Sequence, residues 1–186
     1  MNLIIFAFPS IFLLSAKEKE QQSQAEKDYV LLARATKFFE NNLFSYEGNS
    51  SLNYLRQRGF SDANIKKFHL GFSLNSYEGL INNLKDQGFL ESQMLQSGII
   101  NKNQSGKLYD KFRERIMFPI TDKKGRTIAF GGTASGDNQP KYLNSSETNI
   151  FKKGQNLYNY SNARPAIFDK KFARQYVIFA KNLHAT

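Results

Sequence analysis

A run of basic residues between positions 107 and 130 is the part of the sequence best suited to bind a polyanion. Its basic members are Lys107, Lys111, Arg113, Arg115, Lys123, Lys124 and Arg126, and the aromatic residues between them are Tyr109, Phe112, Phe118 and Phe130. Guanidinium groups pair with phosphates through two parallel hydrogen bonds, and aromatic rings stack on unpaired bases. This composition is typical of a groove for single-stranded nucleic acid.

A structural interpretation of the same run is also open. Phe118 and Phe130 alternate with other apolar residues, as in strands with one buried face, and this favours a place in the core for the aromatic rings. For the basic residues, a solvated face and a phosphate-binding surface fit the pattern about equally well.

Two other places combine charge with turn residues. Arg58 comes just before Gly59, which is expected to end a helix, so the arginine would be held on a turn. Lys141, Tyr142 and Asn144 follow a loop and offer a positive charge, an aromatic ring and an amide. The alternatives are an ordinary surface arginine and, for the serines of "SSET", the N-terminal cap of a helix. The Gly131–Gly132 pair fits either a close backbone approach or a β-bulge.

Several kinds of active site are missing from the sequence. There is no Walker A pattern, no HExxH and no usable Ser/His/Asp arrangement. Zero cysteines and two histidines exclude a thiolate zinc site and a histidine metal cluster. The acidic residues are scattered, and we expect Asp110, Glu114 and Glu147 to be ion-pair or cap partners. We therefore predict no catalytic and no metal-ligating residue in this chain.

The overall charge indicates a polyanionic partner. The 186 residues carry a net charge of +10, which suits nucleic acid or an acidic membrane surface. Residues 1–16 are apolar but too short to span a membrane and lack a basic start, so a membrane-directed protein is the lesser alternative.

The chain positions these residues on short elements. Apolar spacing predicts a helix over 28–43, preceded at 17–27 by a polar linker or a solvated helix start. Shorter helices are expected with caps at Ser51 and Ser61, then over 76–87 and 91–97, with stops at Gly59, Gly71, Gly88 and Gly98. Segments 116–120 and 127–130 predict a β-hairpin with Pro119 near a sheet edge, and 175–180 reads as the start of a buried strand. We expect an α+β fold, with short helices followed by a mixed or antiparallel β region.

Three ordered blocks together resemble bacterial DnaG-type DNA primases. They are "YLRQRGFSDANIKKFHLGFS", "SGIINKNQSGKLYDKFRERIMFPITDKKGRTIAFGG" and "PKYLNSSETNIFKKGQNLYNYSNAR", and the resemblance covers about residues 27–171. It implies the N-terminal subdomain of the RNA polymerase catalytic core, which binds single-stranded template. By motif position it implies nucleic-acid-binding roles for Arg58, Lys141, Tyr142 and Asn144, with Arg113 and Arg115 supporting the groove. Thr133 stands where the family usually has arginine, and Ser146 where it has proline.

The resemblance also sets an expected organisation. Residues 1–26 would be a divergent apolar start and linker, 27–171 the core subdomain, and 172–186 a truncated entry to the Toprim subdomain. Such a primase fragment would bind template but be inactive alone. Zinc and Mg²⁺ or Mn²⁺ are expected only in the full-length family. Alternatives are one half of a split primase completed by a separate Toprim chain, or a non-functional remnant.

The implied partners are single-stranded DNA template and an RNA primer–DNA hybrid. A replicative helicase would bind only through a C-terminal part that this sequence lacks. The resemblance implies a role in DNA replication within the primosome and a cytoplasmic location at the replication fork.

Overall fold

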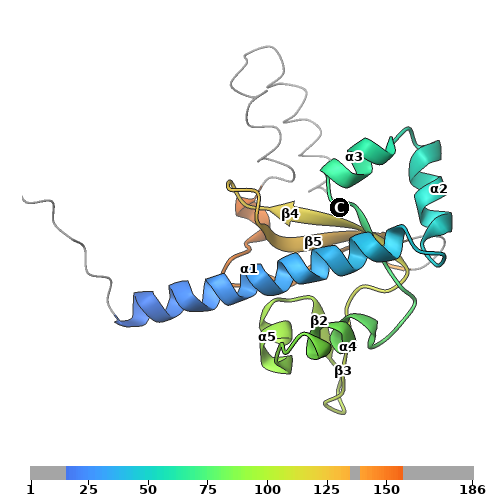
Figure 1. Cartoon of the computed structure of the whole chain (residues 1–186). Helices are drawn as coiled ribbons and strands as arrows, with labels where there is room; N and C mark the ends of the chain where they lie inside the picture. The colour runs from blue at the N-terminus through green and yellow to red at the C-terminus, as the bar shows by residue number, and fades with distance from the viewer. Residues whose placement is uncertain (1–15, 135–138, 157–186) are drawn as a thin grey trace, which may run out of the picture.

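The computed structural model describes residues 16–134 and 139–156 (Figure 1). The strand predicted at 175–180, the apolar start at 1–15 and the predicted segment 172–186 lie outside the described residues. In the part that is described, no helix is both long enough and apolar enough to cross a bilayer.

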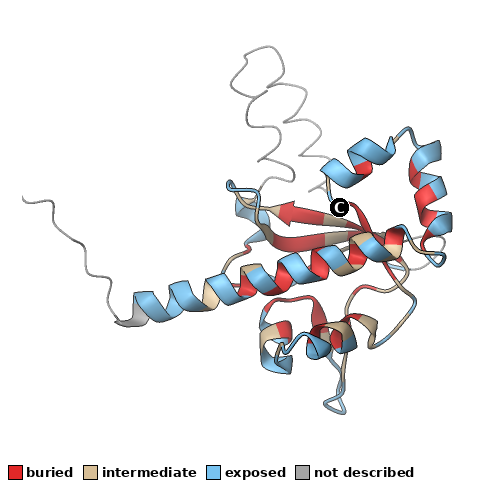
Figure 2. Cartoon of the chain, viewed as in Figure 1, coloured by how far each residue is buried: buried red, intermediate tan, exposed pale blue. Residues whose placement is uncertain are grey.

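The long helix α1 (Ala16–Leu43) lies along a four-stranded sheet (Figure 1). One face of it is buried, through Leu31, Leu32, Ala35, Phe39 and Leu43. The polar stretch 17–27, for which the sequence allowed either a linker or a helix start, is helical, so α1 begins well before residue 28. Its first turns are exposed and extend past the sheet (Figure 2). Good helix formers such as Ala, Glu, Gln and Lys dominate there, which explains the helix without burial.

The sheet is antiparallel throughout and has the order β1-β4-β5-β6. Its strands are β1 (Gly71–Ser73), β4 (Arg115–Thr121), β5 (Thr127–Ala134) and β6 (Tyr142–Asn144). The predicted hairpin is confirmed as β4–β5, and its turn is held by Asp122 Oδ1, which accepts from the backbone N–H groups of Lys124 and Arg126 at 2.8 and 3.0 Å. Pro119 lies beyond the residues of β4 that pair with β1, so its missing N–H breaks no bond on that side.

A smaller lobe lies on the other side of α1 from the sheet in Figure 1. It consists of α4 (Gly79–Asp86), α5 (Glu91–Gln96) and the antiparallel hairpin β2 (Ile100–Lys102) with β3 (Leu108–Asp110). Leu84, Met94 and Ile99 of this lobe share a core cluster with residues of α1, β4 and β5, such as Phe130 of β5. This cluster joins the lobe to the sheet as one body.

Two further helices stand beside the start of β4. They are α2 (Asn49–Gln57) and α3 (Asp62–Lys67), and their buried Leu52, Leu55 and Ile65 share a second cluster with Ile116 of β4. Ser61 caps α3 as predicted, since its side chain accepts from Asn64 N at 3.2 Å. A short 3-10 turn, η1 (Lys153–Gln155), follows the sheet. The α+β fold class is confirmed.

Three local predictions are wrong. The helix cap is Gly48 and not Ser51, because the chain approaches the end of α1 so closely that a Cβ at Gly48 would lie 2.1 Å from the Asn42 carbonyl oxygen. Gly71 does not end a helix but opens β1. The "SSET" segment begins no helix, because Thr148 Oγ1 accepts from Ile150 N and Phe151 N in a local turn.

Candidate nucleic-acid interface

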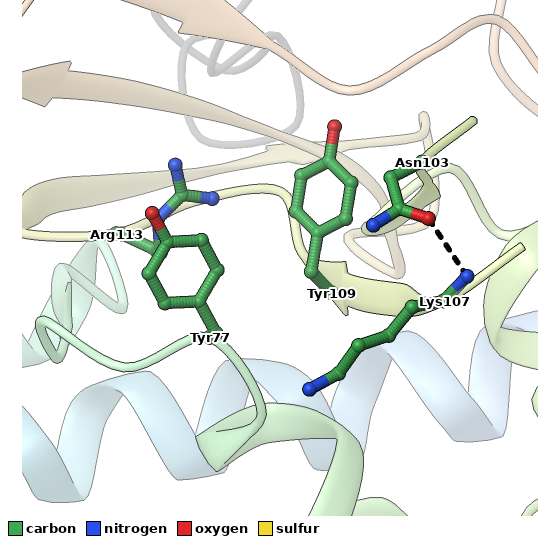
Figure 3. Close-up of a pocket in the computed structure, with 5 residues that line it drawn as sticks. All are labelled: Tyr77, Asn103, Lys107, Tyr109 and Arg113. Carbon is green, nitrogen blue, oxygen red and sulfur yellow. Dashed lines mark hydrogen bonds between the residues drawn. The ribbon is translucent and has the colours of Figure 1, made fainter. Parts of the chain in front are cut away.

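An open hollow of about 430 Å³ lies beside the β2–β3 hairpin (Figure 3). Its lining residues are Tyr77, Asn103, Lys107, Tyr109 and Arg113. They come from three segments: the loop before α4, the β2–β3 hairpin, and the loop that leads into β4. The combination of two aromatic rings with two cations and an amide can receive a flat, negatively charged ligand.

Arg113 contacts both aromatic rings of this hollow. Its guanidinium carbon lies 4.4 Å from the centroid of the Tyr77 ring and 5.6 Å from that of Tyr109. Arg113 Nη1 also donates to the Asp110 carbonyl oxygen at 2.8 Å, which fixes the direction of the side chain. The Tyr77 side chain is 63% exposed, a large fraction for an aromatic ring, and it is therefore open to a further stacking partner.

The turn of the hairpin is built around Asn103. Its Oδ1 accepts from Lys107 N at 2.8 Å, shown in Figure 3, and Gly106 takes a positive φ of 85°. Lys107 Nζ forms an ion pair with Glu78 Oε1 at 2.7 Å, which lowers the pKa of the Glu78 carboxyl. Because Lys107 is paired, Arg113 supplies the unbalanced positive charge of the hollow.

A second basic and aromatic group lies where β4 begins and β5 ends. Lys141 is exposed, with its ammonium 5.8 Å from the ring centroid of Tyr142, and Tyr142 is 49% exposed. Arg115 is only 4% exposed, and its Nη1 donates to the Lys141 carbonyl oxygen at 3.4 Å. Burial, followed by the nearby Arg113, lowers the pKa of Arg115. Arg115 therefore holds the segment that enters β6 from the buried side and does not face solvent.

Asn144, Thr133 and the Gly131–Gly132 pair lie on β5 and β6, next to this group. Asn144 on β6 pairs with Gly131, and its Oδ1 lies 3.2 Å from where a Cβ on Gly131 would be, so the glycine makes room for the amide. Thr133, where the resemblance led us to expect an arginine, pairs with Tyr142 across β5 and β6. The glycine pair forms regular ladder positions, and the irregularity lies at Ile120–Thr121 instead.

Arg58 lies at the C-terminal end of α2 and is exposed. Gly59 follows it with a φ of 89°, as predicted for a helix-ending glycine, and its N–H donates to the Arg56 carbonyl. The Arg58 guanidinium lies 6.0 Å from the centroid of the Tyr54 ring. Since α2 shares core residues with β1 and with the start of β4, Arg58 projects from an element beside that part of the sheet.

Asp110, the neighbour of Tyr109 in the chain, has both carboxylate oxygens engaged by backbone N–H groups. Its two carboxylate oxygens accept from Leu80 N at 2.7 Å and Ile81 N at 3.1 Å, so it caps α4 as the predicted cap partner. Among the described residues there is no group of three or more His, Cys, Asp or Glu that could hold a metal ion. The residues present do not fit the divalent metal that the resemblance implies for the full-length family.

Sequence reasoning identified part of this arrangement. Lys107, Tyr109 and Arg113 belong to the predicted basic and aromatic run, and Arg113 was assigned a supporting role. Tyr77 and Asn103 were not predicted. Tyr77 stands alone between turn residues, and only the fold brings it to Arg113, so no local pattern marked it.

Comparison with known proteins gives a consistent result. A sequence profile of the DNA primase catalytic core, N-terminal domain, matches residues 38–164. The DNA primase of Pseudomonas putida is 41% identical over 149 residues, covering 79% of this chain and 23% of the relative. The DNA primase of Deinococcus radiodurans is 41% identical over 140 residues, covering 75% of this chain and 24% of the relative. The chain thus spans about a quarter of the length of these curated relatives.

Solved structures share the fold. A DnaG primase catalytic domain bound to single-stranded DNA superimposes with a TM-score of 0.71 at 37% identity, covering 78% of this chain and 47% of that one. The RNA polymerase domain of the Mycobacterium tuberculosis primase DnaG, bound to double-stranded DNA with a 6-nucleotide overhang, gives a TM-score of 0.72 at 27% identity. That match covers 76% of this chain and 45% of the other.

Proposed function

The chain belongs to the family of DnaG-type DNA primases, and we propose that it supplies the part of a primase catalytic core that holds the single-stranded template. The observation that carries this proposal is the exposed Tyr77 ring against the Arg113 guanidinium in an open hollow. The relative solved with single-stranded DNA supports the choice of ligand.

The chemistry of the hollow favours an unpaired strand over a duplex. The faces of the bases are covered by their neighbours in a duplex, whereas an unpaired base can stack on the free face of Tyr77. The Arg113 guanidinium, already held by Tyr77 and the Asp110 carbonyl, can then pair with the adjoining phosphate. Stacking and phosphate contact together hold a strand without reading its sequence.

We propose that the same DNA strand also contacts the group that lies where β4 begins and β5 ends. Lys141 and the half-exposed Tyr142 provide a second phosphate and base contact, and Arg58 on α2 provides a third charge. Arg115 influences the bound DNA strand only by holding β6 in place, because its guanidinium is buried against the Lys141 carbonyl. Asn144 of β6, paired with Gly131 of β5, belongs to the same support.

Primer synthesis needs carboxylates that hold divalent cations beside the reacting phosphate. We propose that these carboxylates come from outside the described residues, on the same polypeptide or on a separate one. The described residues would then bind, orient and retain the template while the chemistry takes place elsewhere. A separate Toprim chain, an RNA primer–DNA hybrid and the replicative helicase remain proposed partners.

Fluorescence anisotropy of a labelled single-stranded DNA across a salt series tests the template site. Tyr77→Ala removes stacking, so we expect weaker binding by about 1–3 kcal/mol with an unchanged salt slope. Lys141→Ala and Arg58→Ala each remove a phosphate contact, so each should reduce the slope of log K against log salt by about 0.7. Tyr46→Ala is the matched control, because Tyr46 is 94% exposed and lies on a different loop.

Two results would contradict the proposal. One is binding to single-stranded DNA that Tyr77→Ala leaves unchanged, or weakens only as much as Tyr46→Ala does. The other is an equal or greater affinity for a blunt duplex of the same length and charge per strand. Either result would remove the stacking site from the function of this chain.

A further inference from the structure

Asp110 connects the three segments that build the hollow. Its carboxylate accepts from Leu80 N and Ile81 N at the start of α4, directly after the loop that carries Tyr77. Its own N–H donates to the Tyr77 carbonyl oxygen at 2.7 Å. Its carbonyl oxygen accepts from Arg113 Nη1 at 2.8 Å. Tyr109, the other ring of the hollow, is its neighbour in the chain.

We propose that Asp110 is a positioning residue whose carboxylate holds Tyr77 against Arg113 and so keeps the hollow ready for an unpaired base. The inference rests on the proposed function for its consequence, but the link between Asp110 and Tyr77 is a property of the free protein. Asp110 is itself 4% exposed and does not touch the hollow's ligand, so it acts through the loop and through Arg113.

The ionised carboxylate is the form that this geometry uses. Both oxygens accept an N–H group, and a protonated oxygen or an asparagine amide would place a hydrogen against one of these donors. The start of α4, which follows the loop that carries Tyr77, would then lose one of its two hydrogen bonds to the Asp110 carboxylate. Asp110→Asn therefore imitates the protonated residue at every pH.

The groups around Asp110 determine the pH at which its carboxylate gains a proton. Burial raises the pKa of Asp110 to about 6, against the two backbone N–H bonds and the nearby Arg113, which lower it. Glu78 adds a small raising effect, and its own pKa is lowered by its ion pair with Lys107. Glu78 is therefore charged throughout the range in which Asp110 titrates.

The first experiment needs no DNA. The chain contains no tryptophan, so Tyr77→Trp introduces a single reporter at the site. We expect its emission wavelength or intensity to change with pH in one step near pH 6, as the indole moves relative to Arg113. In the double variant Tyr77→Trp, Asp110→Asn, the step should vanish and the emission should match the low-pH form. Asp86→Asn, an exposed aspartate at the end of the same helix, is the matched control and should keep the step.

The second experiment measures single-stranded DNA binding from pH 5 to pH 8 by anisotropy. At pH 7.5 we expect Asp110→Asn to weaken binding about fivefold, the effect of losing one helix-cap bond. The wild-type protein should approach the affinity of the variant below pH 6. Every other titratable residue is common to the two proteins, so the ratio of their affinities isolates Asp110.

The outcomes separate this inference from the proposed function. An emission step that persists in Asp110→Asn, or no step in either protein, would overturn the positioning role whatever the DNA binds. A step that vanishes as expected, together with a fivefold loss at pH 7.5, supports both. A thermal unfolding transition for each variant, measured at pH 7.5, identifies a variant that has failed to fold. If Asp110→Asn fails to fold, Asp110→Glu, which keeps the charge, should show the emission step. The absence of the step in Asp110→Glu would overturn the positioning role.

Discussion

Arg113 and Arg115 stand two residues apart and have different surroundings. Arg113 lies before β4 and stacks on rings that face the hollow, whereas Arg115 opens β4 and its side chain lies against Gly132. A Cβ at Gly132 would come within 3.1 Å of Arg115 Cδ, so the glycine leaves the space in which the buried side chain reaches Lys141. One arginine of the pair thus lies in the hollow, and the other holds the segment that carries Lys141, the second phosphate contact that we propose.

Gly71 is a position where a single methyl group should disturb the fold. A Cβ there would lie 2.5 Å from Phe39 Cβ and 2.7 Å from the Phe39 carbonyl carbon, in the contact between β1 and α1. Because one neighbour is backbone, the clash cannot be relieved by a rotamer change, and we expect Gly71→Ala to lower the free energy of unfolding by about 3 kcal/mol. Urea denaturation measures this. Gly154→Ala, with nothing within 4 Å, should change it by much less, and equal effects would contradict the close contact.

The buried Asp110 predicts a pH-dependent stability with a definite sign. Its pKa is about 6 in the folded chain against an ordinary value of 3.8, so between these values the folded state binds more protons than the unfolded state. The free energy of unfolding should therefore fall as pH rises from 4 to 6, by at most about 3 kcal/mol from this group. Protonation thus stabilises the fold as a whole even though it removes a bond that holds the loop.

Urea denaturation at pH 4, 5, 6 and 7 measures this effect. The difference between wild-type protein and Asp110→Asn isolates it, since the other carboxylates titrate in both. A difference that is constant across the range would show that Asp110 has the same pKa in the folded and unfolded chain.

At the scale of elements, the helices and the central hairpin follow from the sequence, and the short strands do not. The spacing of Leu32, Phe39 and Leu43 predicts α1, and glycine stops mark the ends of α2, α4 and α5. Strands β1, β2, β3 and β6 have three residues each, too few for an alternating pattern to be recognised. Their partners are distant in the chain, so only the tertiary fold defines them. Tyr77 reaches the hollow through such a distant contact, since its carbonyl accepts from Asp110 N at the end of β3, and no local pattern marks it.

One cluster joins α1 to the turn between β4 and β5. Arg126 lies over the Tyr29 ring at 3.6 Å from its centroid, and it bonds Asp122 Oδ2 at 2.8 Å and Glu26 Oε1 at 3.2 Å. The Arg126 side chain is partly exposed, which limits the ion-pair contribution, and most of the effect comes from stacking and the hydrogen bonds. We expect Arg126→Ala to reduce the free energy of unfolding by about 1–2 kcal/mol.

The matched variants separate charge from shape. Arg126→Lys keeps the charge but not the planar fork, so it should recover less than half of the loss. Arg34→Ala removes an exposed arginine from α1 and should have little effect. Chemical denaturation of the three variants decides the matter, and full recovery by lysine would assign the contact to charge alone.

Across the whole molecule, the positive charge is less free than the net value of +10 suggests. Six Lys or Arg residues of the described part form ion pairs with carboxylates: Lys37, Arg56, Lys85, Lys107, Arg126 and Lys152. Arg113, Lys141 and Arg58 instead lie against aromatic rings. Composition alone therefore predicts a polyanionic partner but not its place, because the distinction between paired and stacked cations exists only in the fold.

The last prediction concerns activity. Outside the described residues the sequence contains only two carboxylates, Asp137 and Asp169, and the described part holds no group that could bind a metal ion. Phosphoryl transfer to a nucleotide depends on cations held by clustered carboxylates. We therefore expect the purified chain, given single-stranded template, ribonucleotides and Mg²⁺ or Mn²⁺, to bind the template and to make no primers. Labelled-nucleotide incorporation resolved on a denaturing gel measures this, with a complete DnaG-type primase as the positive control. Primers that are lost in Tyr77→Ala would show that the chain is sufficient for catalysis and would move the proposed function from template holding to synthesis itself.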